Sequence, residues 1–96
     1  MLAVIQTHSD GALLIGRCYR HAGFVYRVLP GWCMNSLCGP VVPAVYVNEV
    51  MPGVGRTLLT ETFFEMATAI DRAEFDAAYR RAYDGELKEH RRLCGV

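Results

Sequence analysis

Apolar runs and turn-forming residues alternate over the first thirty positions of the chain. Three apolar runs, at 2–7, 12–20 and 24–29, are separated by Asp10-Gly11 and by 21–23, which reads His-Ala-Gly. Asp-Gly between two apolar runs is typical of a β-hairpin, because a type I′ turn needs positive φ at both central residues. The pattern therefore predicts a three-stranded antiparallel meander at the N-terminus.

The register of these expected strands assigns the side chains to two faces. If Arg20 pairs with Phe24 across the second turn, small and apolar residues share one face: Ala3, Ile5, Leu14, Gly16, Cys18, Phe24, Tyr26 and Val28. The other face mixes apolar, aromatic and basic side chains: Leu2, Val4, Gln6, His8, Ile15, Arg17, Tyr19, Val25, Arg27 and Leu29. Arg17 then lies directly opposite Arg27, and such a pair needs water or an acidic partner. Two interpretations follow, solvated arginines or a binding surface.

Residues 30–55 differ in character from the meander. All four prolines, at 30, 40, 43 and 52, lie here together with the only tryptophan, Trp32. A connection of this length is typical of a functional loop or a mobile segment. Within it, apolar residues alternate over 44–50 behind Pro43, and proline is tolerated at the first position of a strand. This alternation predicts a further strand at an edge of the sheet.

The last forty residues carry one ambiguous segment and one clear helix. Threonine and phenylalanine over 56–66 favour a strand, although Thr62 and Glu65 have the spacing of a helical capping box. We interpret this segment as a strand. A second capping box, Asp71 with Glu74, precedes a stripe at helical spacing: Phe75, Ala78, Tyr79, Ala82 and Tyr83. The spacing predicts a C-terminal helix over 71–93.

Together these elements predict an α+β fold. The expected architecture is an antiparallel sheet of about five strands, with the C-terminal helix packed on the small-residue face of the meander. A chain of 96 residues is expected to form a single domain, spanning 1–96. One helix covers only one face of a sheet, so the opposite face is expected to remain open.

Composition sharpens this picture. Ten basic residues balance ten acidic ones, so nothing in the net charge attracts nucleic acid, and we expect none as a partner. The apolar fraction of 52% is high for so short a chain, which places apolar surface on the outside. The most apolar window, 37–54, contains three prolines and cannot span a membrane. We therefore expect a surface for protein contacts.

The cysteines and histidines offer weaker alternatives. No secretory signal pattern precedes them, so we expect a cytoplasmic protein with free thiols. Cys33 with Cys38 and His90 with Cys94 have the form of two ligand pairs for zinc, which would make a zinc-stabilised nucleic-acid-binding or regulatory module. A third possibility is a small thiol enzyme, for which nothing in the sequence fixes a base. We expect no cofactor.

No catalytic constellation stands out, so the sequence favours a non-enzymatic function. We expect a small protein that binds and inhibits or modulates another protein, or binds itself as a homodimer. Its anchors would be Arg17, Tyr19, Val25 and Arg27 on the sheet, and Trp32 and Tyr46 in the connection. Nine of the ten basic residues are arginine, which is typical of GC-rich bacterial or phage genomes and suggests a phage or mobile-element protein.

Overall fold

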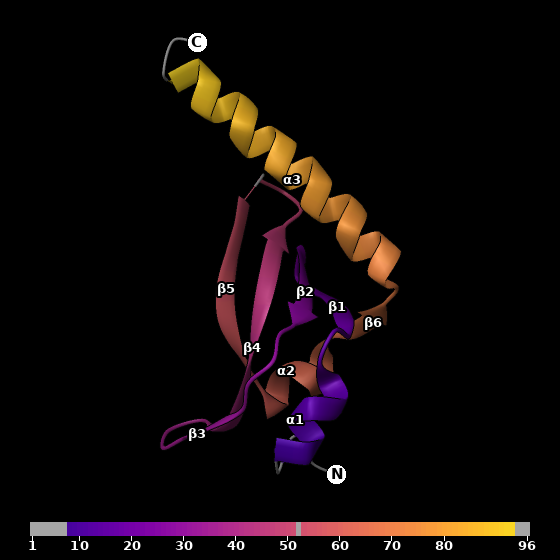
Figure 1. Cartoon of the computed structure of the whole chain (residues 1–96), viewed down its shortest axis with the longest axis vertical. Helices are drawn as coiled ribbons and strands as arrows, with labels where there is room; N and C mark the ends of the chain where they lie inside the picture. The colour runs from indigo at the N-terminus through magenta and orange to yellow at the C-terminus, as the bar shows by residue number, and fades with distance from the viewer. Residues whose placement is uncertain (1–7, 52, 94–96) are drawn as a thin grey trace.

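The computed structural model describes residues 8–51 and 53–93, with side chains described for 10–51 and 53–84. It has an α+β fold, as predicted, with an antiparallel sheet and one long C-terminal helix (Figure 1). The elements in chain order are α1 (His8–Leu14), β1 (Cys18–His21), β2 (Phe24–Val28), β3 (Cys33–Asn35), β4 (Gly39–Asn48), β5 (Gly53–Thr60), α2 (Glu61–Met66), β6 (Thr68–Ile70) and α3 (Arg72–Leu93).

The longest strand, β4, lies at the centre of the six-stranded sheet. Strand β5 pairs along one side of it, while β2 and then β3 pair along the other. From β2 the sheet continues to β1 and ends at β6. The sheet therefore follows chain order from β1 through β2 and β4 to β5, as expected of a meander.

Helices cover the two faces of this sheet unequally. Helix α3 crosses one face, and the shorter α1 and α2 lie near the lower end of the sheet in Figure 1. Beneath α3, Phe75, Ala78 and Ala82 form a buried cluster with Cys18, Val25 and Val47 of the strands. A second buried cluster holds Leu14, Val28, Val42, Ala44 and Leu59. Three of the five residues of the stripe predicted for the C-terminal helix, Phe75, Ala78 and Ala82, thus dock it on the sheet.

Asp10-Gly11 does not form the predicted hairpin, because both residues lie within α1. Gly11 instead lies close to Trp32. A Cβ atom at this position would lie 3.0 Å from Cδ1 of Trp32, so a larger residue would push the indole away by a few tenths of an ångström. Leu14, at the end of the same helix, is buried in the core. The strand expected at 2–7 lies outside the described residues.

The second predicted turn exists, but its register differs by one residue. Ala22 and Gly23 have φ angles of 50° and 84°, so the turn has two central residues and His21 pairs with Phe24. Cys18 consequently faces Arg27, and Arg17 lies outside the strand. A shift of one position moves every side chain of a strand to the other face. The predicted opposition of Arg17 and Arg27 is therefore wrong.

The predicted long connection over 30–55 is mostly strand, and its expected edge strand is the central strand β4. Pro43 is tolerated within β4 because its position coincides with a break in pairing. Its carbonyl accepts a hydrogen bond from the Leu29 amide at 2.9 Å, just beyond β2 and before the segment paired with β3. Pro43 therefore lies where the pairing with β2 ends, and its missing N–H costs a hydrogen bond only at the end of that ladder.

The ambiguous segment 56–66 is a strand only in its first half. Strand β5 continues to Thr60, which is the N-cap residue of α2. The capping box predicted from Thr62 does not mark the start of this helix, since the helix begins earlier, at Glu61. The C-terminal helix is found over Arg72–Leu93, close to the predicted 71–93. Its C-terminal part extends beyond the ends of β4 and β5 along the long axis of the molecule (Figure 1).

Candidate binding groove

The six side chains predicted as partner anchors do not share one surface. Val25 is fully buried beneath α3, so it is unavailable to a partner in the folded chain. Arg27 lies on the α3 side of the sheet, because it pairs with Cys18 of the cluster beneath the helix. Tyr19 pairs with Tyr26, which pairs with Tyr46, and this row lies on the opposite side. Half-buried Trp32 packs against the second cluster.

Two arginines nevertheless lie side by side on the α3 face. Arg27 of β2 and Arg56 of β5 both pair with Val45 of β4, so the three form one row across the sheet. Two strand spacings of about 4.8 Å place the arginine backbones roughly 10 Å apart. Among the side chains that the structure describes, neither arginine forms an ion pair. This row is not the predicted pair, because Arg56 takes the place expected for Arg17 and Val45 lies between the two arginines.

A groove runs between these arginines and the flank of α3. Its first part, of about 380 Å³, is lined by Arg27, Leu29, Val45, Arg56, Phe75, Asp76 and Tyr79. A second part, of about 300 Å³, is lined by Asp76, Tyr79, Arg80 and Tyr83. The two parts share Asp76 and Tyr79 and therefore adjoin each other. We name these nine residues the arginine groove.

The groove combines an apolar floor with exposed aromatic and basic side chains. Phe75, 2% exposed, lies at its base, and the Arg27 guanidinium carbon is 5.9 Å from the centroid of that ring. Tyr79 and Tyr83 on α3 are 40% and 52% exposed. Three arginines and one carboxylate line the groove, which gives it a positive charge. Its only acidic side chain, Asp76, lies 3.8 Å from Arg72 of the same helix.

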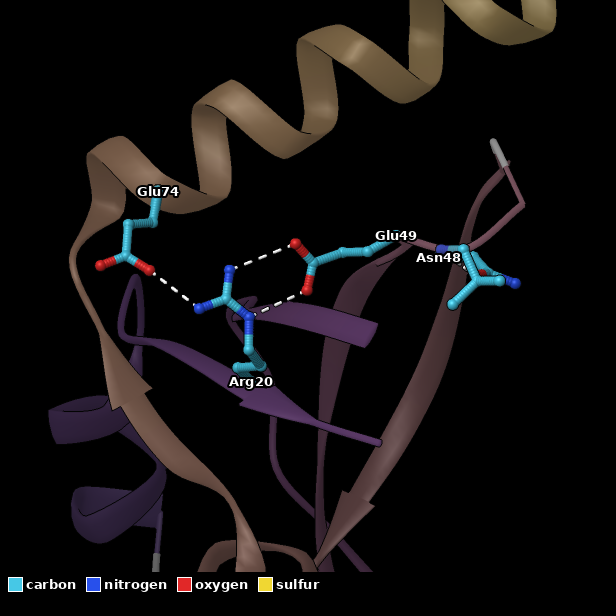
Figure 2. A network of polar contacts seen from close by, with 5 residues as sticks. Arg20, Asn48, Glu49 and Glu74 are labelled. Atoms are coloured by element: carbon cyan, nitrogen blue, oxygen red, sulfur yellow. Dashed lines mark hydrogen bonds and ion pairs between the residues drawn. The ribbon is translucent and has the colours of Figure 1, made fainter. Parts of the chain in front are cut away.

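Arg20, on the same face, has a different environment (Figure 2). Its Nε and Nη2 donate to the two carboxylate oxygens of Glu49, at 2.9 and 3.2 Å, and its Nη1 donates to Glu74 at 3.0 Å. These hydrogen bonds lower the pKa of Glu49 and raise the pKa of Arg20. The network joins β1, the β4–β5 turn and the first turn of α3.

The β4–β5 turn is itself shaped so that Glu49 can reach Arg20. The side-chain oxygen of Asn48 accepts hydrogen bonds from the amides of Val50 and Met51, at 2.9 and 3.1 Å. The Glu49 amide donates to the Gly23 carbonyl in the neighbouring turn, at 2.9 Å. An asparagine that bonds to the backbone ahead of it is typical of a tight turn. Arg20 is therefore part of a structural clamp.

The opposite face of the sheet carries half-buried rings: Tyr19, His21, Phe24, Tyr26, Tyr46, Phe63 and Phe64. They contact one another mainly edge to face, with Tyr26 and Phe63 closest at 4.7 Å between centroids. The Tyr46 ring also lies against Gly55, where a Cβ atom would come within 2.6 Å of its oxygen. Burial raises the pKa of the Tyr26 phenol. These rings pack against one another, and several of them also pack against the second buried cluster. Their contacts are therefore made within the chain.

The geometry gives little support to a zinc site or a reactive thiol at the cysteines. Cys33 and Cys38 lie exposed in the β3–β4 hairpin, at the opposite end of the molecule from the C-terminal end of α3 that carries His90 (Figure 1). The side chains of His90 and Cys94 lie outside the described residues. Among the side chains that are described, no three metal-ligating groups cluster. Burial raises the pKa of Cys18, which opposes formation of a reactive thiolate.

Sequence reasoning missed Arg56, Arg80 and the exposure of Tyr79 and Tyr83. It assigned both tyrosines to the buried stripe of α3, from which they are displaced by one helical position toward the flank. The pairing of Arg56 with the same residue as Arg27 depends on β4 being central, which the local pattern did not indicate.

Within the described part of the chain, no helix is both long and apolar enough to cross a bilayer. Comparison of the chain with family models, curated proteins and solved structures gives no match.

Proposed function

We propose that this chain is a non-enzymatic protein that binds another protein through the arginine groove and thereby inhibits or modulates it. The observation that carries the proposal is the row of Arg27, Val45 and Arg56 beside two exposed tyrosines. Arginine and tyrosine dominate the binding energy of protein interfaces when they surround a site that excludes water. The groove offers both residue types around an apolar floor.

Further exposed apolar side chains support the proposal that the groove binds a protein. Leu58 is 57% exposed and lies two positions from Arg56 in β5, hence on the same face of the sheet. Together with Tyr79 and Tyr83 it extends the apolar surface on both sides of the arginine row. An exposed apolar surface beside the groove suits a segment of another chain. A second copy of this chain is the alternative occupant.

We also propose a reducing compartment, such as the cytoplasm of a bacterial or phage-infected cell. Cys33 and Cys38 are exposed and their thiols are free, which fits a reducing environment. The phage or mobile-element origin rests on the size and the arginine-rich composition of the chain. Thiol titration of the freshly isolated protein checks the compartment, since a disulfide between exposed cysteines would contradict it.

Site-specific photo-crosslinking in the cells that express the chain tests the proposed function. We expect Tyr79→p-benzoylphenylalanine to give a discrete product, and the same change at Leu13, 71% exposed on α1, to give none. The product should disappear when Arg27 and Arg56 are both replaced by glutamine. A product of twice the mass of the chain would identify a second copy as the partner. Identical products from both positions would contradict a specific groove.

A further inference from the structure

We infer that the arginine groove binds an acidic, extended segment of the partner, with one carboxylate held between Arg27 and Arg56 and an apolar neighbour on the floor. This inference rests on the proposed function and specifies the chemistry of the partner. It concerns the charge of the occupant, which the proposed function leaves open.

The charge argument starts from the difference between the arginines on this face. Arg20 meets two carboxylates of its own chain, whereas Arg27 and Arg56 meet none among the described side chains. A partner that covers the groove removes water from both guanidinium groups. Burying an unpaired charge is costly, so a stable complex requires the partner to supply the anion. The occupant must therefore be acidic at this point.

The geometry of the row favours a carboxylate. Arg27 and Arg56 flank Val45 in one row of the sheet, and both line the same part of the groove. A guanidinium presents parallel donors that match the two oxygens of a carboxylate. Once a partner covers the groove, its apolar floor of Leu29, Val45 and Phe75 leaves little room for water around such a contact. A low local dielectric strengthens each charged hydrogen bond. One aspartate or glutamate side chain thus fits the row.

The remaining charges of the groove favour a peptide over a nucleic acid. Asp76 lines both parts of the groove, so an anion next to the first carboxylate would be repelled there. Arg80 lies further along the same flank of α3 and can accept a second acidic residue. A continuous phosphate backbone has a negative charge at every step, whereas a peptide can place an apolar residue beside Asp76. The groove therefore matches alternating acidic and apolar residues.

Titration of the isotopically labelled full chain with short peptides, followed by NMR, tests this inference. The probe is a peptide alternating Glu and Leu, compared with the same peptide carrying Gln in place of Glu. We expect shifts at the amides and guanidinium groups of Arg27 and Arg56 and at Val45 and Tyr79. The affinity should fall at least about tenfold with the Gln peptide, with Arg27→Gln and Arg56→Gln, and should weaken at higher salt.

Arg17→Gln is the matched control, because Arg17 is exposed outside the strands and should leave the affinity unchanged. Equal affinity for the Glu and Gln peptides would overturn the inference, as would shifts confined to the opposite face. An oligothymidylate that binds the groove as tightly as the Glu peptide would overturn the choice of a peptide. Photo-crosslinking from position 79 reports separately on the proposed function. If a partner crosslinks but the groove binds the Glu and Gln peptides equally, this inference alone is overturned. If the groove prefers the Glu peptide but no partner crosslinks, the proposed function is overturned.

Discussion

Arg20 and the Arg27–Arg56 row occupy the same face of one sheet, yet among the described side chains only Arg20 of these three forms ion pairs. Arg20 is held by Glu49 and Glu74 at hydrogen-bond distance, from the β4–β5 turn and from α3. Arg27 and Arg56 lie near the same helix and meet an aromatic ring and an apolar floor instead. Arg20 is therefore paired within the fold, whereas Arg27 and Arg56 have no carboxylate partner among the side chains that the structure describes.

Exposure does not explain this difference. The Arg20 side chain is 41% exposed even with both carboxylates in place, so it remains in contact with water. What differs is the ion pairing: within the described part of the chain, Glu49 and Glu74 pair with Arg20, and no carboxylate pairs with Arg27 or Arg56. The following substitutions test this difference between Arg20 and the Arg27–Arg56 row. The first removes the Phe75 ring, which docks α3 on the sheet.

Phe75→Ala should have the largest effect, because Phe75 docks α3 on the sheet and also lies beneath Arg27. Truncating a buried phenylalanine costs about 3–5 kcal/mol, which is a large fraction of the stability of a small domain. Urea unfolding at neutral pH measures the loss. Phe75→Leu should cost about 1 kcal/mol and keep the chain folded. Leu13→Ala, at an exposed position of α1, is the control, and an equal loss there would contradict the role of Phe75.

The outcome at α3 shows what a local pattern can predict. Its stripe of Phe75, Ala78 and Ala82 recurs at three and four positions, so sequence spacing alone identifies the buried side of the helix. Asp10-Gly11 shows the limit. That dipeptide resembles a hairpin turn, but the glycine lies in a helix and packs closely against Trp32, twenty-one positions away. A close approach between distant segments leaves no mark in the local sequence.

The candidate site depended on register, which is harder to predict. The sequence identified Arg27 as an anchor and expected a second arginine opposite it. Ala22, a residue that rarely takes a positive φ, completes a two-residue turn and shifts the expected pairing by one position. The true neighbour, Arg56, comes from β5 through the shared partner Val45. Only the order of strands in the sheet reveals it.

Arg20→Gln should have the next largest effect on stability. It removes a bidentate contact with Glu49 and a further contact with Glu74, both at the surface, and should cost about 1 kcal/mol. A double-mutant cycle with Glu49→Gln isolates the coupling of that pair, which should weaken in high salt. A coupling of zero at low salt would show that Arg20 is not a structural clamp.

Arg27→Gln and Arg56→Gln should leave stability nearly unchanged, in contrast to Arg20→Gln. Each change removes a positive charge that has no acidic partner among the described side chains. For Arg27 the loss of its contact with the Phe75 ring limits the cost to about 0.5 kcal/mol. Urea unfolding of each variant beside Arg17→Gln measures this. A loss as large as that of Arg20→Gln would remove the distinction between the two settings.

The smallest expected effect is the pH dependence of the Arg20 network. The Arg20 hydrogen bonds hold the pKa of Glu49 below its usual value, so the folded chain favours the ionised carboxylate. This stabilisation is fully present above the unfolded pKa of about 4.3 and is lost as the pH falls through the folded pKa. The difference in unfolding free energy between the unaltered chain and Glu49→Gln should therefore be constant from about pH 7 to 5 and shrink by a few tenths of a kcal/mol below about pH 4. Urea unfolding across this range measures it, with Glu65→Gln, at an exposed carboxylate of α2, as the control. A difference that stays constant to about pH 3 would mean that Arg20 does not hold Glu49 in its ionised form.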